Sequence, residues 1–127
     1  AAVTNVYARA VFFVEDAERA RRFYVDKLAF TQEWGSPGED GITWVCQVSL
    51  FGFELILNQV WGDSVGKQGH GRVFIGLEDD QIEPMRQHIA KLGIPTERRE
   101  WGKPTLVIED PDGNELFFWD WPEKRGS

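Results

Sequence analysis

Val11-Phe12-Phe13-Val14-Glu15-Asp16 and Val73-Phe74-Ile75-Gly76-Leu77-Glu78-Asp79 are two copies of one pattern, an apolar strand that leads into an acidic turn. Each copy continues into a helical stretch, and these stretches end at Lys27-Leu28-Ala29-Phe30 and Lys91-Leu92-Gly93-Ile94. Three strand-like runs follow each helix, so the chain is a duplicated βαβββ unit. Because neither copy buries its own sheet face alone, the copies must join. The pattern predicts an α+β fold in which two modules form a curved mixed sheet around a cleft.

The chain of 127 residues has the length of one domain, built here from two modules at about 5–60 and 71–121 with a linker at about 61–70. Asp16 is expected to cap the first helix, and Asp79 or Asp80 the second. We expect the second helix to become regular near Ile82 or Glu83, because Pro84 is tolerated only in a first turn, and to end at Gly93. The expected strands are 6–14, 30–34, 42–50, 52–59, 95–100, 104–109 and 115–121, with a loop at 35–41 and a hairpin turn at Phe51-Gly52.

Composition narrows the class of protein. The net charge of −7 argues against nucleic acid as a partner and favours cationic small ligands, although solubility alone also explains it. The lone Cys46 excludes an internal disulfide, which predicts a cytoplasmic protein, and its place in an apolar strand predicts an inert buried thiol. No secretory leader is visible, and no apolar run approaches the ~20 residues of a membrane span.

Six tryptophans in 127 residues are unusually many. An indole ring offers a wide apolar face with one N–H donor, which suits stacking on planar ligands or packing at an interface.

Three segments carry a family resemblance. Glu15-Asp16, the run from Phe23 to Phe30 and Asp110-Pro111-Asp112-Gly113-Asn114 resemble the vicinal-oxygen-chelate superfamily, which includes glyoxalase I, extradiol dioxygenases and fosfomycin- and bleomycin-resistance proteins. Trp101-Gly102-Lys103 resembles the bleomycin-resistance branch, in which such a Trp contributes to the drug groove. The resemblance covers nearly the whole chain, but the fold hosts many functions.

The metal-dependent members of this superfamily hold a divalent ion with side chains from the first and last strands of each half. The resemblance places the first-strand positions at Arg9 and Arg72 and a last-strand position at Phe117. Two arginines and a phenylalanine do not bind such metals. A displaced site of His70, Glu115 and Glu54 is the alternative, although His70 fits a linker better and His88 is expected on the solvent side of its helix.

Without a metal, the cleft is expected to be aromatic. Its Trp61 either closes over a ligand or covers a dimer seam, and the other rings either line the cleft or belong to the core. Carboxylates of Glu54, Asp63 and Glu115 either pair with a cationic ligand or remain solvated. The predicted ligand-binding residues are Trp34, Trp44, Glu54, Trp61, Trp101, Phe117 and Trp119.

The leading hypothesis is a homodimeric protein of the bleomycin-resistance type that sequesters a planar, cationic antibiotic without catalysis, cofactor or metal. The alternative is a metal-dependent lyase, isomerase or dioxygenase of the same superfamily. A ligand-sensing or accessory module is a third possibility.

Overall fold

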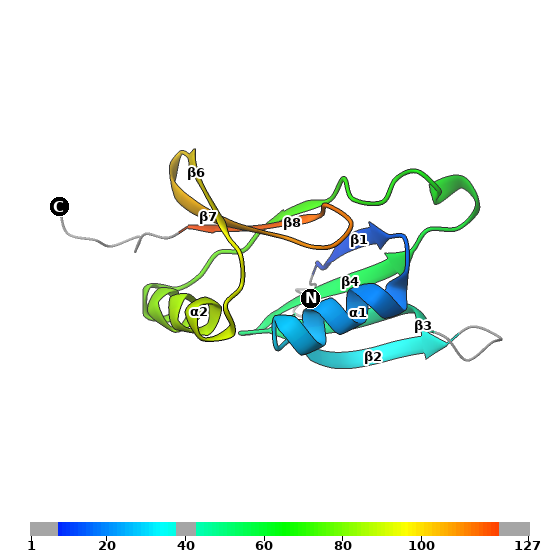
Figure 1. Cartoon of the computed structure of the whole chain (residues 1–127), viewed down its shortest axis with the longest axis horizontal. Helices are drawn as coiled ribbons and strands as arrows, with labels where there is room; N and C mark the ends of the chain where they lie inside the picture. Colours follow the sequence, from blue (N-terminus) through cyan, green and yellow to red (C-terminus); the bar gives the residue numbers. More distant parts are fainter. Residues whose placement is uncertain (1–7, 38–42, 120–127) are drawn as a thin grey trace, which may run out of the picture.

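The computed structural model describes residues 8–37 and 43–119, which form two four-stranded mixed sheets (Figure 1). The first sheet has the order β1-β4-β3-β2 and the second β5-β8-β7-β6. In both, the first and last strands of a βαβββ unit pair in parallel and the remaining pairs are antiparallel. The α+β fold class predicted from the sequence is therefore confirmed. The strands are β1 (Ala10–Val14), β2 (Thr31–Pro37), β3 (Thr43–Leu50), β4 (Phe53–Gln59), β5 (Arg72–Phe74), β6 (Glu97–Trp101), β7 (Lys103–Glu109) and β8 (Glu115–Trp119).

The helix of the first unit, α1 (Ala17–Arg22), lies across one face of the first sheet (Figure 1). Asp16 caps it as expected, since its carboxylate accepts hydrogen bonds from the backbone N–H groups of Glu18 and Arg19 at 3.0 and 3.1 Å. The helix then loosens into a π-helical turn, η1 (Phe23–Lys27). This turn points Tyr24 into the core.

The helix of the second unit, α2 (Asp79–Leu92), begins earlier than expected. The cap is Glu78, whose N–H donates to the side chain of Gln81 at 2.9 Å, and neither Asp79 nor Asp80 takes that role. Pro84 lies inside the helix and not in its first turn, so the expected start near Ile82 was wrong. Burial of Ile82, Met85 and Ile89 against the core outweighs the backbone hydrogen bond that a proline removes.

Two turns follow from the sequence. Gly93 ends α2 in the left-handed region at φ 64°, as expected of a C′ glycine. Phe51 and Gly52, both with positive φ, connect β3 to β4 as predicted. The expected loop at 35–41 is wrong at its start, because β2 extends through Pro37 opposite β3. Residues 38–42, the first two residues of the strand expected at 6–14 and the last two of the strand expected at 115–121 lie outside the described residues.

One core joins the two units. Alternate residues of β1 and β4, including Phe12, Val14, Leu55 and Leu57, share a buried cluster with residues of the second unit such as Leu116 and Phe118. The segment between β4 and β5 contains a short 3₁₀ turn, η2 (Gly62–Ser64), and runs past the end of β1 (Figure 1).

The turn at Asp110–Asn114 fastens the second unit to the first. Asn114, fully buried, donates from Nδ2 to the carbonyl of Phe13 at 3.0 Å, and Asp112 accepts from the backbone N–H of Glu15 at 2.9 Å. The hydroxyl of Tyr24 donates to Asp110 at 3.1 Å. Burial raises the pKa of Asp110 despite the hydrogen bonds that its carboxylate accepts from Asn114 and Tyr24. Polar side chains thus set how the two sheets are joined.

Within residues 8–37 and 43–119, no helix has the length and apolar character that crossing a membrane requires.

Candidate functional site

The face of the second sheet that points away from the shared core is aromatic. Successive side chains of a strand alternate between faces, so Phe74 of β5, Phe117 and Trp119 of β8 and Trp101 of β6 lie on one face. Ring centroids lie 5.6 Å apart for Phe74 and Trp101, 4.9 Å for Phe74 and Trp119, and 5.4 Å for Trp101 and Phe117. Phe117 is buried beneath the others, whereas Phe74 and Trp101 are exposed. The face is a preformed aromatic platform.

Cations surround this platform. The guanidinium carbons of Arg72 and Arg99 lie 4.9 and 5.3 Å from the centroid of the Phe117 ring, and the Lys103 ammonium lies 4.6 Å from the Trp119 ring. Glu115 accepts from Arg72 at 3.0 Å and from Arg99 at 2.7 Å. These hydrogen bonds lower the pKa of Glu115, with Arg99 the larger cause. The carboxylate is therefore already partnered on both sides.

The corresponding face of the first sheet also exposes aromatic surface. Val11, Ile56, Gln47 and Trp34 form a row across β1, β4, β3 and β2. The Trp34 indole N–H donates to the side-chain oxygen of buried Gln47 at 2.9 Å, which fixes the ring over the sheet. Arg9 pairs with Glu54 just before β1, in the register position that Arg72 and Glu115 occupy in the second unit.

A pocket of about 530 Å³ opens where this face meets the segment between the sheets. Trp61 is 83% exposed, and its backbone is held by a hydrogen bond from its N–H to the hydroxyl of Ser64 at 2.7 Å. Trp44, half exposed, lies on another wall of the pocket. A volume above about 300 Å³ with mainly apolar walls is typical of small-molecule sites. The lining residues are Phe13, Trp44, Asn58, Gln59, Val60, Trp61 and Ser64.

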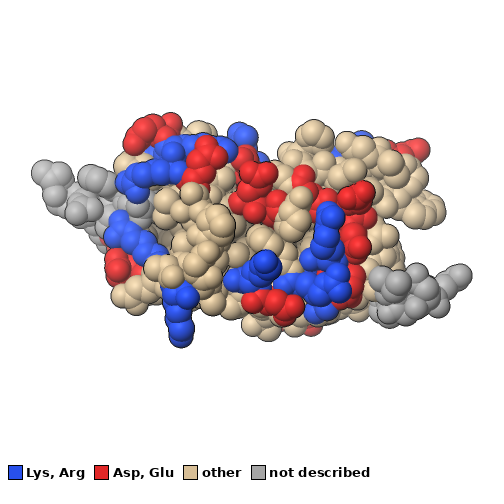
Figure 2. Space-filling model, viewed as in Figure 1, with Lys and Arg blue, Asp and Glu red and all other residues tan. Residues whose placement is uncertain are grey.

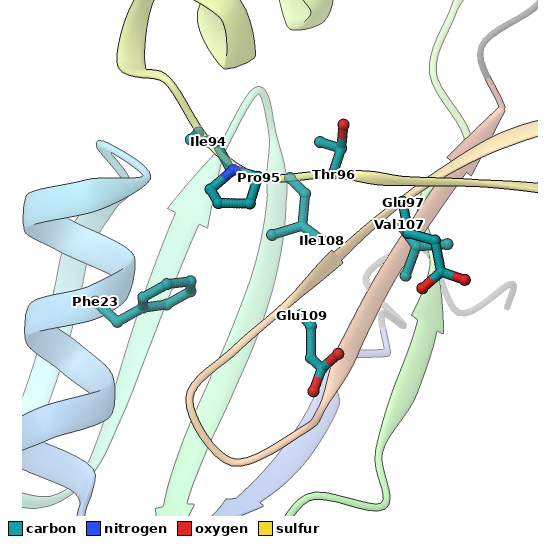
Figure 3. A pocket seen from close by; sticks show the side chains of 8 residues that line it. All are labelled: Phe23, Ile94, Pro95, Thr96, Glu97, Val107, Ile108 and Glu109. Atoms are coloured by element: carbon teal, nitrogen blue, oxygen red, sulfur yellow. The ribbon is translucent and has the colours of Figure 1, made fainter.

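A second hollow, of about 280 Å³, lies between η1 and the start of β6 (Figure 3). The Phe23 ring points toward Pro95 and Ile108, and the carboxylates of Glu97 and Glu109 lie at the rim. It contains no indole ring among its lining residues and is about half as large as the tryptophan pocket. Two of its lining residues, Glu97 and Val107, belong to the face of the second sheet that carries Phe117.

The residues at the superfamily's metal positions do not fit a divalent ion. Arg72 and Phe117 lie against each other on the second sheet, and Arg9 is bound to Glu54. Positive guanidinium groups at these places repel a cation. Among the residues that the structure describes, no group of three His, Cys, Asp or Glu side chains is arranged to hold a metal.

The displaced metal site is not assembled either. Glu54 and Glu115 each bind arginine, and they lie in different sheets. His70 is exposed in the segment before β5 and is not part of a strand, as its glycine neighbours suggested. The three side chains therefore do not form one donor set in the described structure.

Two other side chains with reactive groups, His88 and Cys46, pack against the rest of the protein. His88 is half-buried and not on the solvent side of α2, because its Nε2 lies 2.6 Å from the carbonyl oxygen of Leu28 and links α2 to the end of η1. The expectation of a plain surface histidine was therefore wrong. Cys46 is fully buried, and burial raises its pKa to about 11.

The structure sorts the predicted ligand-binding residues into two groups. Trp101, Phe117 and Trp119 share one face of the second sheet. The other group has Trp34, Trp44 and Glu54 in the first unit and Trp61 in the segment that follows it. Sequence reasoning missed Phe13, Phe74 and Arg99. Period two from Arg9 and Arg72 would have placed Phe13 and Phe74 on the faces of those arginines.

Charge on one face of the molecule is mixed. Figure 2 shows acidic and basic side chains interspersed on the face in view, without a large area of one sign. This arrangement differs from the continuous basic surface that nucleic-acid binding requires.

Comparison with known proteins places this geometry in a family. The structure resembles the bleomycin-binding protein of bleomycin-producing Streptomyces verticillus, solved with copper(II)-bleomycin, with a TM-score of 0.68, 16% identity and coverage of 94% of this chain and 99% of that one. It resembles lactoylglutathione lyase from Agrobacterium tumefaciens with a TM-score of 0.63, 17% identity and coverage of 91% and 93%. It also resembles TnmS3, an antibiotic binding protein from Streptomyces sp. CB03234, with a TM-score of 0.57, 21% identity and coverage of 91% and 97%.

At these identities, structural likeness shows the fold alone. No curated protein matches the chain in a sequence comparison. The family profile described as the Glyoxalase/Bleomycin resistance protein/Dioxygenase superfamily matches residues 7–118. With nearly its whole length matched, the chain belongs to the Glyoxalase/Bleomycin resistance protein/Dioxygenase superfamily.

Proposed function

We propose that the protein binds and sequesters a planar antibiotic without chemical conversion, in the manner of a bleomycin-type resistance protein. The pocket with Trp44 and Trp61 on its walls carries the proposal. An exposed, positioned indole ring gains most when a flat molecule covers it, because both apolar surfaces leave water. The antibiotic-binding proteins that share the fold make a drug a reasonable ligand class.

The affinity that sequestration needs is within reach of these rings. Stacking on one aromatic side chain is worth roughly 1–3 kcal/mol. Two stacked rings, apolar burial against Phe13 and one charge pair would together approach the roughly −8 kcal/mol of a micromolar complex.

We further propose that the drug is cationic, as the net charge of −7 favours. Of the three carboxylates considered from the sequence, Glu54 and Glu115 already pair with arginine. Asp63 is exposed in η2, two residues after Trp61 and next to Ser64, although it is not itself one of the residues that line the pocket. A cationic group of a ligand stacked on Trp61 is therefore expected beside Asp63.

Sequestration without catalysis agrees with the side chains at the superfamily's metal positions. Arg9, Arg72 and Phe117 offer no ligand to a divalent ion, and their places are filled by ion pairs and ring contacts. A bound drug would meet aromatic and guanidinium groups there.

We also propose that the functional unit is a cytoplasmic homodimer with two clefts at the subunit interface. Both sheet faces expose large apolar side chains, including Val11, Trp34, Phe74 and Trp101. Exposed apolar area of this kind favours a partner surface. Sedimentation velocity over a range of protein concentrations tests the proposal, since a species of one chain at all concentrations would contradict it.

Titration with bleomycin, free and bound to copper(II), tests the drug assignment. We expect saturable quenching of tryptophan fluorescence at tens of micromolar drug or less. Trp61→Ala removes one stacking interaction, so it should weaken the apparent affinity for the drug at least tenfold. Phe51→Ala, an exposed ring at the β3–β4 turn, is the matched control, and a copper(II) salt alone accounts for quenching by the metal. If neither form of bleomycin quenches the protein, bleomycin is excluded. A panel of planar antibiotics then tests the broader assignment.

A further inference from the structure

We propose that the aromatic face of the second sheet is an anion subsite, where the acidic group of an aromatic ligand takes the place of the Glu115 carboxylate between Arg72 and Arg99. This inference rests on the proposed binding of a planar ligand, and it specifies the chemistry of a second group on that ligand. A carboxylate, sulfonate or phosphate attached to a flat ring system fits the arrangement.

The two guanidinium groups are already set for an oxyanion. Both lie within 5.3 Å of the Phe117 ring centroid, and both donate to the same carboxylate of Glu115. A guanidinium has five N–H donors in a planar fork that matches the oxygens of an oxyanion. Glu115 therefore acts as the intramolecular stand-in for a ligand's acidic group.

The cations of this face gather at its aromatic rings. Arg72 and Arg99 lie over Phe117 and Lys103 lies over Trp119, while the face also carries the three carboxylates Glu97, Glu109 and Glu115. The formal charges are therefore balanced, and the case for an anion rests on the two guanidinium groups that converge on one carboxylate. Arg72, with 59% of its side chain exposed, is accessible to an incoming ligand.

Aromatic surface lies directly beside the two arginines. Trp101 is 45% exposed and stands edge-on to the Phe117 ring, so a ligand ring stacked on this indole would carry its acidic group toward Arg99. The indole Nε1–H of Trp119 is buried without a hydrogen-bond acceptor among the described residues. An unsatisfied donor next to the cations adds to the demand for an acceptor.

Removing the charge of Glu115 should change ligand affinity in opposite directions for an anionic and a cationic ligand. If the subsite holds an anion, removing the charge of Glu115 removes its competitor and strengthens binding. If the subsite holds a cation, the same substitution removes the counter-charge and weakens binding.

Three probes with one ring system test the inference by ligand-observed NMR titration of the full chain: 2-naphthoate, neutral 2-naphthylmethanol and 2-naphthylmethylammonium. We expect the affinity of naphthoate, and not that of the ammonium compound, to depend on the two arginines of this face. Glu115→Gln should tighten naphthoate binding about tenfold, and Arg99→Gln or Arg72→Gln should weaken it about tenfold, as expected for one charge-assisted hydrogen bond. Glu83→Gln and Arg86→Gln, an exposed ion pair on α2, are the matched charge controls.

The outcomes separate the two proposals. Unchanged or weaker naphthoate binding by Glu115→Gln, with all three probes bound by the wild type, overturns the anion subsite and leaves planar-ligand binding in place. Absence of binding by every probe counts against both. Circular dichroism and thermal unfolding of each variant exclude loss of fold as the cause, and the gain expected for Glu115→Gln cannot come from unfolding.

Discussion

Arg72 of β5 and Glu115 of β8 form an ion pair at 3.0 Å between directly opposed residues of two parallel strands. The same register position in the first unit holds Arg9 and Glu54. Each half of the duplicated chain thus has an arginine–carboxylate pair, and its arginine stands at the first-strand position where the family resemblance implies a metal ligand in the metal-dependent members. The two faces that carry these pairs expose aromatic rings, among them Trp34 and Trp101.

The charge of Glu115 stabilises the folded state in a pH-dependent manner. Arg99 and Arg72 lower the pKa of this carboxyl below its ordinary value of 4.5. A carboxyl whose pKa is lower in the folded than in the unfolded chain stabilises the fold above 4.5, and this contribution is lost as the pH falls through the folded pKa. Glu115→Gln should therefore lower the free energy of unfolding by about 1 kcal/mol at neutral pH, and by progressively less in acid.

Denaturant unfolding from neutral pH downward measures this difference. Glu83→Gln, at an exposed pair on α2, is the control and should show the smaller effect at neutral pH. A difference between wild type and Glu115→Gln that stays constant into acid would contradict the role of the charge.

The hydrogen bond from Tyr24 to Asp110 holds α1's π-helical end to the turn before β8. Both side chains are buried, so Tyr24→Phe leaves a carboxylate oxygen short of one donor. We expect the variant to lose about 1–2 kcal/mol of unfolding free energy. Asp110→Ala, which removes the acceptor, completes a double-mutant cycle that should give a coupling energy of about 1 kcal/mol. Additive effects of the two substitutions would show that the bond contributes nothing.

Gly69 is required where the segment between the sheets crosses the Asp110–Asn114 turn. A Cβ there would lie 2.0 Å from the carbonyl oxygen of Asp112, and φ is +81°. Gly66 has φ +98° but open space around its Cα. Gly66→Ala should therefore cost about 1 kcal/mol from the positive φ alone, and Gly69→Ala clearly more, because the two backbones must separate. Thermal unfolding of both variants compares them, and equal losses would mean that the close approach is not needed.

Cys46 should be inert in the folded protein. Its thiol is buried, and burial raises its pKa to about 11, so almost no thiolate is present near neutral pH. A thiol-reactive dye such as Ellman's reagent should label one thiol per chain only after denaturant is added. Rapid labelling of the native protein would show that this strand opens readily.

The fold was predictable because its signals are local and repeated. A few neighbouring residues were enough to predict each of three features: the two strand–turn–helix copies, the turn at Phe51-Gly52 and the helix end at Gly93. Two predictions were wrong because tertiary packing outweighed local preference: the helix start inferred from Pro84, and the loop predicted to begin at residue 35. A proline in α2 is tolerated since the apolar side of the helix is buried.

The candidate site was harder to predict because its contacts join residues of different strands and depend on how those strands pair. Arg72 could be placed by position, but its contacts with Glu115 and Phe117 require the parallel register of β5 and β8. Arg99 was missed because it comes from β6, which reaches Glu115 from two strands away. Of the two arginines that bind Glu115, the sequence thus indicated Arg72 but not Arg99.

The indole N–H spectrum of the protein, recorded by ¹H–¹⁵N NMR during titration with a planar antibiotic, tests the central claim most directly. Trp44 and Trp61 line the pocket, so the account predicts saturable shifts of their indole resonances. Zn²⁺ or Mn²⁺ at the same concentration should produce no stoichiometric change in the spectrum. Unmoved Trp44 and Trp61 resonances across a panel of such drugs, together with a stoichiometric response to a divalent ion, would contradict it.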